Sequence, residues 1–357
     1  MIPILYDSSE TAFSSNGLGR LRDCATCTVT EERNGIYECE FTYPVDGAHF
    51  DEILLGRIIA VEHDYSNDVQ PFDITQISEP IDGLVTFHAT HISYRLSKCV
   101  ATASNVQTMA SALSALSNAV PDHGFTFESD MSGSGYVSAF DGTPMTVKSL
   151  LGGVEGSLLD TFGGEYLFDK FSVQLKQQRG VARNLTVRYG LNMTDYNDDL
   201  DITETYNACI AYWKGQSNNT DVIVKTDLVS SGLASYSGRT ECIALDLTDK
   251  FESQPTVAQL TTAAQTYMSS NQTNMPSRTI KVSFINLRDT TEYAELLPLF
   301  DCNLCDSIKV VFPRYGLEGT FKIVKTVYDV LLERFDEMEL GNLSLTLSEA
   351  LGLGGKK

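Results

Sequence analysis

The sequence lacks the features typical of membrane proteins and of nucleic-acid-binding proteins. No apolar run approaches the roughly 20 residues that a membrane-spanning helix needs. Lysine and arginine number only 26 against 47 aspartate and glutamate residues, so the formal net charge is −21. A surface that binds nucleic acid neutralises phosphates with basic side chains, and this chain has no excess of them. We expect no membrane segment and no sequence-specific nucleic acid binding, and the acidic charge favours solubility.

A secretory signal is also missing, because residues 1–7 have neither a basic n-region nor a long apolar h-region. We therefore expect a soluble protein made in a cytoplasm, without structural disulfides among its eight cysteines. Cys24 with Cys27, and Cys302 with Cys305, have the spacing of zinc ligands. The two pairs lie far apart, however, and residues three apart in a strand point to opposite faces. We expect the cysteines to act as small buried hydrophobic residues.

Motifs of the common catalytic classes are absent. The chain contains no His-Glu-x-x-His, no Gly-x-Ser-x-Gly and no Walker A loop. His88 and His91 lie three apart in a predicted strand, hence on opposite faces, so they are poor co-ligands for a metal. Paired acids fit solvated turns better than a general acid and base, namely Asp198 with Asp199 and Asp246 with Asp249. We expect no catalytic residue, no cofactor and no metal.

The length of 357 residues indicates two or three domains, and 42% hydrophobic residues are ordinary for a soluble globular chain. Residues 1–100 are predicted to be mostly β. Their expected strands are separated by glycine, aspartate and proline, a pattern typical of a small barrel or sandwich. Besides the hairpin described next, these strands cover residues 53–61, 71–77 and 84–91.

Residues 27–44 show the clearest local pattern in the chain. Tyr37, Cys39, Phe41 and Tyr43 alternate with polar residues after Asn34-Gly35, and the preceding arm alternates in the same way with Ala25, Cys27 and Val29 apolar. This predicts a β-hairpin. A two-residue turn would place Val29 opposite a glutamate. A three-residue loop of residues 33–35, with Gly35 in the left-handed conformation, pairs Val29 with Cys39 and Cys27 with Phe41, and we predict that loop.

Residues 101–165 change to helical spacing. Apolar residues recur every three to four positions over residues 105–119, and Pro121 ends the predicted helix. A second helix is predicted from Thr146, as N-cap, to Gly163-Gly164, although it would have to contain Gly152, Gly153 and Gly156.

A second hairpin is predicted over residues 165–175. A two-residue turn at Asp169-Lys170 would pair Phe168 with Phe171 and Tyr166 with Val173, giving an apolar face. Further strands are expected at residues 185–189, 208–213, 221–225 and 279–285, with a helix at residues 256–268. The single tryptophan, Trp213, lies in a predicted strand, and its side chain is expected to pack in the hydrophobic core.

Three blocks of this sequence resemble the prophage tail-endopeptidase family, the hub or tail-associated lysin N-terminal proteins at the tip of long phage tails. The first is VTEERNGIYECEFTYPVDG at residues 29–47, with a related strand at residues 91–96. The second covers residues 155–192, and the third covers residues 282–342. Matching positions in the third block are Leu287, Thr291, Glu292, Tyr293, Cys305-Asp306, residues 328–331, Glu333-Arg334 and residues 339–341.

The resemblance implies an α+β, mainly β fold of several small domains, including two β-barrel-like domains and a few helices. We expect an N-terminal barrel-like domain at residues 1–100, completed by residues near 205–250, an α+β domain at 101–204, and a second β-rich domain at 251–357. The sequence ends at Lys357, so we expect none of the peptidase, fibre or receptor-binding regions that follow in many family members.

The function that the resemblance implies is structural. A hub of this kind is a homotrimer at the virion tail tip, assembled in the host bacterial cytoplasm, that closes the tail tube and opens a channel for tape-measure protein and DNA. Its partners would be the tail tube or distal tail protein, the tape-measure protein, and spike or fibre proteins. The net acidic charge would suit a channel wall to which DNA does not stick. Two alternatives are a tail-associated peptidoglycan endopeptidase and a module that binds carbohydrate of the host wall.

Overall fold

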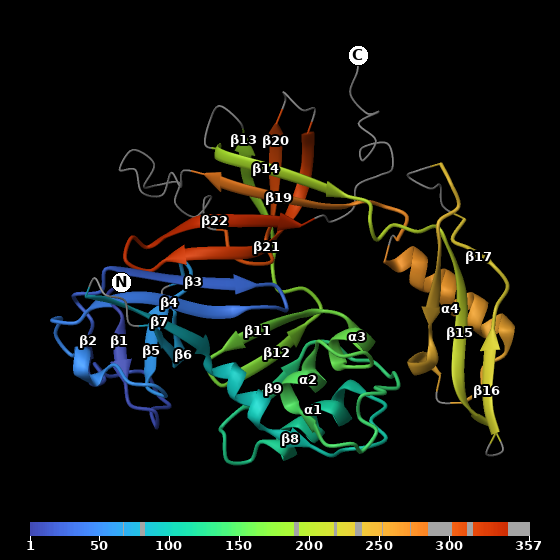
Figure 1. Cartoon of the computed structure of the whole chain (residues 1–357), viewed down its shortest axis with the longest axis horizontal. Coiled ribbons are helices and arrows are strands. Elements are labelled where there is room, and N and C mark those ends of the chain that lie inside the picture. Colours follow the sequence, from blue (N-terminus) through green and yellow to red (C-terminus); the bar gives the residue numbers. More distant parts are fainter. Residues whose placement is uncertain are drawn as a thin grey trace.

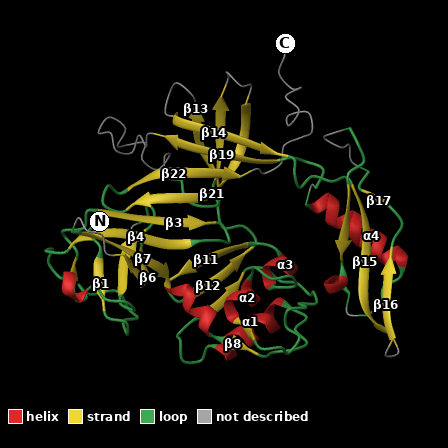
Figure 2. Ribbon diagram, in the orientation of Figure 1, coloured by secondary structure: helices red, strands yellow, loops and turns green. Residues whose placement is uncertain are grey.

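The computed structural model describes residues 1–66, 68–78, 83–188, 193–217, 220–232, 238–251, 253–271, 273–284, 302–312 and 317–341. Over these residues the protein is mainly β with few helices, which confirms the predicted fold class. Figures 1 and 2 show a long sheet, a compact mixed module beside it, and a smaller sheet with one long helix. None of the helices in these ranges has the length and apolar character needed to cross a bilayer.

A single 13-stranded sheet contains both N-terminal and C-terminal residues. Its main path runs in the order β14-β19-β22-β21-β3-β4-β7-β6-β5-β1-β2, with β13 and β20 paired beside β21. The N-terminal strands are β1 (Ile4–Tyr6), β2 (Gly19–Arg20), β3 (Thr26–Glu32), β4 (Tyr37–Pro44), β5 (Ile58–Glu62), β6 (Val69–Ser78) and β7 (Leu84–His91). The later strands are β13 (Ala182–Arg188), β14 (Met193–Asp201), β19 (Ser277–Phe284), β20 (Ser307–Phe312), β21 (Leu317–Asp329) and β22 (Arg334–Gly341).

The hairpin of β3 and β4 has the predicted register. Cys27 pairs with Phe41 and Val29 with Cys39, and the loop has three residues, 33–35. Asn34, not Gly35, adopts the left-handed conformation, with φ of 59°. The prediction for Gly35 is therefore wrong. Asn34 tolerates this φ, and its side-chain amide is held by the backbone of residues 164 and 166.

The burial pattern of this hairpin differs from the prediction at two positions. Ala25 was placed on the apolar face, but it precedes β3 and is exposed. Glu31 follows Val29 on that same face and is 4% exposed. The alternation of buried and exposed positions in β3 therefore extends beyond the last apolar residue, Val29. The next buried position is Glu31, whose carboxylate is buried.

The strand beside β3 comes from the other end of the chain. β21 pairs antiparallel with β3, with Tyr328 opposite Val29. We expected residues near 205–250 to complete the N-terminal barrel-like domain, and their strands instead form a separate sheet. Period-two patterns show which residues form strands but do not show which strands pair, so this error could not have been detected from periodicity. The domain boundaries themselves stay a prediction.

The mixed module contains β9 (Thr126–Ser129), β11 (Glu165–Asp169) and β12 (Ser172–Lys176) in one sheet, where β12 pairs parallel with β9. β8 (Val100–Ala101) pairs with β10 (Met145–Thr146). Three helices pack here, α1 (Met109–Ala119), α2 (Val147–Leu151) and α3 (Leu158–Phe162). The 3-10 helices η1 (Phe50–Glu52) and η2 (Ile92–Lys98) precede the module in the chain.

Two predicted elements of this module need correction. The first helix begins at Met109 with Thr108 as N-cap, four residues later than predicted. The second has Thr146 as N-cap, as predicted, but it ends at Leu151, and a new helix begins after Ser157. Gly153 and Gly156 have φ of 95° and 72°, a conformation incompatible with a continuing helix.

The hairpin of β11 and β12 turns one residue later than predicted. Phe168 pairs with Val173 and Tyr166 with Leu175, so the turn residues are Lys170 and Phe171. Lys170 has a positive φ of 50°. Each residue of β11 thus pairs with the β12 residue two positions after its predicted partner. Side chains two positions apart in a strand point to the same face, so the apolar face is preserved.

A separate sheet contains β15 (Ala208–Ser217), β16 (Thr220–Lys225), β17 (Val229–Ser230) and β18 (Cys242–Asp246). The 3-10 helix η3 (Thr248–Lys250) and the helix α4 (Val257–Ser270) follow it. Thr256 caps α4 through a capping box with Gln259, which explains the helix start that the sequence predicted. Trp213 lies in β15, is buried, and donates to the carbonyl of Phe251, which confirms its core position.

The structure agrees only in part with the predictions for the cysteines and the paired acids. Six cysteines are buried, Cys24 is half-buried, and Cys242 is exposed, so the expectation of burial is wrong for Cys242. Asp198 and Asp199 lie within β14 and not in a turn, whereas Asp246 ends β18 and accepts hydrogen bonds from Thr248. Four positions of the third family-like block lie outside the described residues, namely Leu287, Thr291, Glu292 and Tyr293.

The junction of β21 and β3 provides the first test. Tyr328 is 2% exposed and packs against Tyr65 and Phe335. We expect Tyr328→Ala to lower the free energy of unfolding by about 3–5 kcal/mol, because it leaves a cavity where the two ends of the chain meet. Denaturant unfolding measures this. Leu332→Ala, at a side chain 57% exposed, should change it by less than about 0.5 kcal/mol, and equal effects would contradict the packing described.

Candidate functional site

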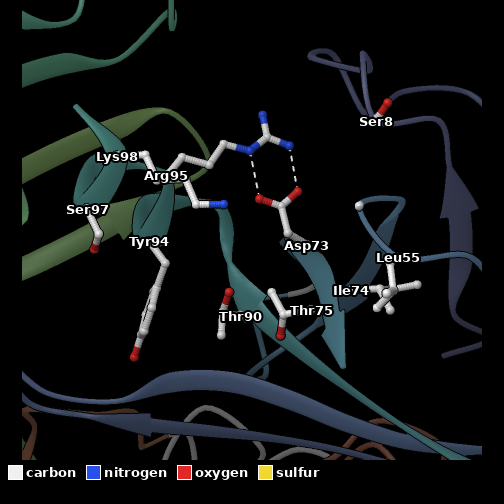
Figure 3. Close-up of a pocket in the computed structure, with 11 residues that line it drawn as sticks. Ser8, Leu55, Asp73, Ile74, Thr75, Thr90, Tyr94, Arg95, Ser97 and Lys98 are labelled. Carbon is white, nitrogen blue, oxygen red and sulfur yellow. Dashed lines mark hydrogen bonds and ion pairs between the residues drawn. The ribbon is translucent and has the colours of Figure 1, made fainter. Parts of the chain in front are cut away.

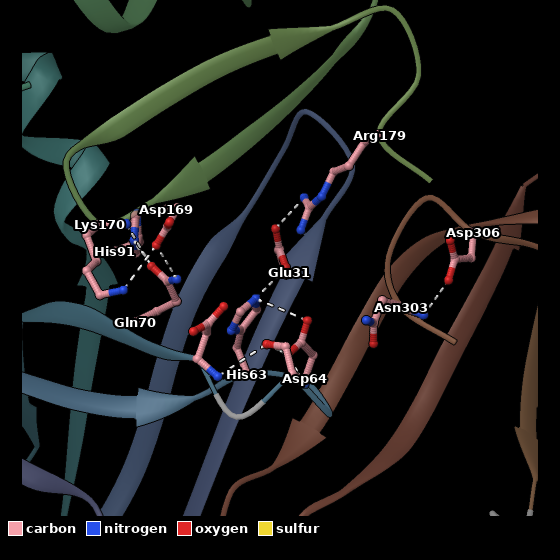
Figure 4. A network of polar contacts seen from close by, with 12 residues as sticks. Glu31, His63, Asp64, Gln70, His91, Asp169, Lys170, Arg179, Asn303 and Asp306 are labelled. Atoms are coloured by element: carbon pink, nitrogen blue, oxygen red, sulfur yellow. Dashed lines mark hydrogen bonds and ion pairs between the residues drawn. The ribbon is translucent and has the colours of Figure 1, made fainter. Parts of the chain in front are cut away.

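Buried ionic groups gather where the β3–β4 hairpin, the β11–β12 hairpin and β21 meet. Glu31 in β3 pairs with Arg179, which follows β12, at 2.6 Å between Oε1 and Nη1. Arg179 also donates to the carbonyl of Tyr166. Figure 4 shows the arginine reaching from the mixed module towards Glu31 on the long sheet. Both side chains are largely buried, at 11% and 6% exposure, so each charge depends on the other.

A second buried carboxylate, Glu165 at the start of β11, continues the network. The Oε1 atom of Glu165 lies 2.5 Å from Nζ of Lys322 in β21 and 3.5 Å from Nη1 of Arg33 in the hairpin loop. Its Oε2 atom accepts a hydrogen bond from the backbone N–H of Arg179. Burial acts to raise the pKa of Glu165, but Lys322 and the Arg179 N–H outweigh it and lower the pKa. Glu165 therefore stays ionised and joins the mixed module to β21.

The third carboxylate, Asp306, joins β13 to β20. It pairs with Arg183 at 2.6 Å and accepts hydrogen bonds from the backbone N–H groups of Val181 and Asn303. Gly180 lies so close that a Cβ there would approach the Cys305 carbonyl oxygen to 2.0 Å. The resemblance included Cys305-Asp306, and the structure gives the aspartate a structural role.

Two histidines lie at the edge of this network, as Figure 4 shows. His63 Nε2 lies 3.6 Å from Asp64 and 4.0 Å from Glu31. His91 is fully buried, and its ring stacks on Tyr37 at 4.3 Å between ring centroids. Burial lowers the pKa of His91 well below its ordinary value, and the nearby positive charges act in the same direction.

Gln70 links His91 to the mixed module. Its amide donates to Asp169, and its carbonyl oxygen accepts from the Lys170 backbone N–H at the turn of the β11–β12 hairpin. His91 lies 3.4 Å from the same oxygen. His88 is on the opposite face, partly exposed beside Glu40, so the prediction that the two histidines face apart is confirmed.

A separate hollow of about 720 Å³ is lined by residues of β6 and η2, among others. Figure 3 shows its main charged pair, Asp73 and Arg95, joined by two hydrogen bonds of 2.6 and 2.7 Å. Thr75, Thr90 and Ser97 add hydroxyl groups to its wall. The charges of Asp73 and Arg95 compensate each other, and Lys98 adds one positive charge to the lining.

These arrangements hold modules together and do not resemble a reaction centre. Within the described ranges, no three side chains of histidine, cysteine, aspartate or glutamate are placed to hold a metal ion. The sequence predicted no site residue and missed the buried ions entirely. The only local signal was Glu31, an acid at a position where the alternation required a buried residue.

Known structures share this fold. The prophage tail protein gp18 of Listeria monocytogenes EGD-e superposes with a TM-score of 0.63 at 16% identity, covering 98% of this chain and 97% of that one. The 43 kDa tail protein of prophage MuSo2 from Shewanella oneidensis gives 0.60 at 11% identity, covering 95% and 97%. A tail protein from Neisseria meningitidis MC58 gives 0.58 at 11% identity, covering 98% of each chain.

The fold is thus that of phage tail proteins. Residues 181–351 match the family model described as prophage endopeptidase tail, which confirms the resemblance recognised from the sequence. No curated protein matches the chain. Residues 181–351 are thus similar in sequence to this family, and the fold is similar to that of phage tail proteins.

The pair of Glu31 and Arg179 gives a second test. Arg179→Met or Glu31→Met alone leaves one charge buried without its main partner, so we expect each to destabilise the protein by about 3–5 kcal/mol. The double variant should lose clearly less than the sum, since no buried charge is orphaned. Chemical unfolding measures all three. Arg239→Met, at an arginine 77% exposed, should cost less than about 1 kcal/mol. Additive losses would show that the two side chains act independently.

His91 gives a third test. A histidine in the unfolded chain takes up a proton below about pH 6.5, while buried His91 resists protonation because its folded pKa is lowered. Stability therefore falls as pH drops below about 6.5, by at most about 1.4 kcal/mol per pH unit from this group. His91→Gln should flatten the stability curve between pH 7 and pH 5.5, whereas His88→Gln should leave its slope unchanged. Parallel curves for His91→Gln and the parent protein would refute the assignment.

Proposed function

We propose that this protein is the hub subunit of a phage or prophage tail tip, closing the tail tube and forming a central channel. The observation that carries the proposal is the continuous sheet in which β21 and β22 extend β3 and β4. One rigid sheet then contains residues from both ends of the chain. Such a sheet suits a subunit that must transmit force between a tube above it and fibres or a spike below it.

The charge on one face of this sheet is the argument for the proposed channel. On β3, β4, β21 and β22, alternate residues point away from the apolar core, and this set is largely acidic. Its acidic members are Glu32, Glu38, Glu40, Asp329, Glu337 and Glu339, and its basic members are Lys325 and Arg334. His88 of the neighbouring β7 lies beside Glu40. We infer that this face, called here the acidic sheet face, lines the channel. Its charge would repel DNA phosphates over a distance of about 10 Å, so passing DNA would not adhere.

A channel requires several subunits around an axis. We infer a homotrimeric ring, in which one face of each subunit fits a different face of the next. An obligate interface of this kind buries on the order of 2,000 Å² or more. Tail tube or distal tail protein, tape-measure protein, and spike or fibre proteins would be its neighbours at the virion tail tip, after assembly in the host cytoplasm.

The proposed role is structural and not enzymatic. The matching family is described as an endopeptidase tail, yet the sequence contains no His-Glu-x-x-His, no Gly-x-Ser-x-Gly and no Walker A loop. The described carboxylates with the most buried positions are held in ion pairs with arginine or lysine. Among them, Glu165 has a pKa that Lys322 and the Arg179 N–H lower against the effect of burial, which makes it a poor general acid.

Light scattering of the purified protein over a range of concentrations tests this proposal. We expect a mass near three times 39.3 kDa, because a hub ring needs three copies. Reversing the charge of Glu38 and Glu40 to lysine on the acidic sheet face should leave that mass unchanged and create binding to duplex DNA in a filter assay. A monomer at every concentration, even with the cognate tube protein, would contradict the ring. A cleared band on a cell-wall zymogram would contradict the structural role.

A further inference from the structure

Lys148 in α2 carries a charge that its surroundings do not neutralise. Its ammonium group lies 4.4 Å from the centre of the Tyr94 ring and 5.0 Å from that of Phe168. Across the part of the chain that the structure describes, no carboxylate lies within ion-pair distance of it. Burial lowers its pKa to about 8, and no acidic side chain contributes to the shift. Glu32 and Glu38 act on the pKa of Tyr94, not on that of Lys148.

This lysine lines a small pocket between the mixed module and the β3–β4 hairpin. The pocket has a volume of about 90 Å³. Asn34 and Gly35 of the hairpin loop form one side of it, while Leu151, Leu159 and Phe168 contribute apolar surface. The Tyr166 hydroxyl is already used, because it donates to the Leu151 carbonyl. The ammonium group is thus the one ionised side chain among the residues that line the pocket.

The two rings stabilise the ammonium group only in part. The negative faces of the two rings attract the ammonium group, but neither ring carries a charge that neutralises it. A ligand that brings a negative charge to Lys148 would therefore gain more here than at an exposed lysine. The small volume excludes large anions, and the apolar walls favour a ligand with an aliphatic part.

We propose that the Lys148 pocket binds a short aliphatic carboxylate, with the ammonium group pairing with the carboxylate and Leu151, Leu159 and Phe168 covering the aliphatic part. The carboxylate belongs either to a free small molecule or to an acidic side chain of a second copy of this chain. This site does not rest on the proposed hub function, and its test uses neither the ring nor the channel.

Acetylation with trace acetic anhydride across pH 6–11, read by mass spectrometry on the full-length protein, measures the proton affinity of each lysine. Lys225, an exposed lysine, serves as internal reference. We expect the Lys148 midpoint near pH 8 in buffer alone. With propionate the midpoint should rise by at least one unit, so that labelling at pH 8.5 falls by at least about threefold. Propionamide, which has the same shape without charge, should have no effect.

Two variants locate the effect. Leu159→Phe fills the pocket without removing the lysine, and it should abolish the response to propionate while Lys148 remains reactive. In equilibrium dialysis with radiolabelled propionate, Lys148→Met should lose binding, whereas Lys98→Met, at an exposed lysine of the nearby η2, should retain it. If Leu159→Phe does not fold, the dialysis comparison decides alone.

The remaining outcomes are also decisive. A Lys148 midpoint that ignores propionate would overturn the proposal, and an equal response to inorganic phosphate would overturn the carboxylate specificity. The source of the carboxylate follows from labelling without additives. Protection of Lys148 in concentrated protein that disappears on dilution would identify an acidic side chain of a second copy. Full reactivity at both concentrations would identify a free small molecule.

Discussion

The pairing of β21 with β3 is the constraint on which the rest of the structure depends. It joins residues about 300 positions apart and makes one sheet from the two ends of the chain. Closing so long a loop costs entropy, which the chain recovers by burying Tyr328, Val29 and their neighbours on the same face. Everything between these strands, including the mixed module and the β15–β18 sheet, must leave and return to that sheet.

Charge, not apolar contact alone, fixes how the mixed module sits on the sheet. Glu31 with Arg179 and Glu165 with Lys322 are buried pairs whose members come from different elements. A buried ion tolerates little displacement, because losing its partner leaves an uncompensated charge. Apolar surfaces can slide against each other at smaller cost. The ion pairs therefore define one relative position of the mixed module and the sheet, which the proposed hub function would require.

The two faces of the long sheet differ in composition and in their contribution to stability. The inner face packs aromatic rings such as Tyr37, Phe41 and Tyr328, and it supplies the stability of the N-terminal part. Over the described residues, the acidic sheet face has no apolar cluster and carries charged side chains, of which Glu32 and Glu40 are paired with Lys325 and His88. Its composition is free to serve the proposed channel, and this separation explains why a strongly acidic chain can still have an ordinary core.

The sequence by itself determined the local elements. Period-two alternation gave the β3–β4 hairpin with its register, Thr146 was correctly predicted as an N-cap, and the helix near residues 256–268 was correctly placed, since capping and alternation depend on neighbours in the chain. Only the tertiary structure decided that β21 pairs with β3, that Glu31 is buried against Arg179, and that the Lys148 pocket exists. Each of these depends on groups more than 50 positions apart, and no local pattern records which distant partner will satisfy a strand edge or a buried charge.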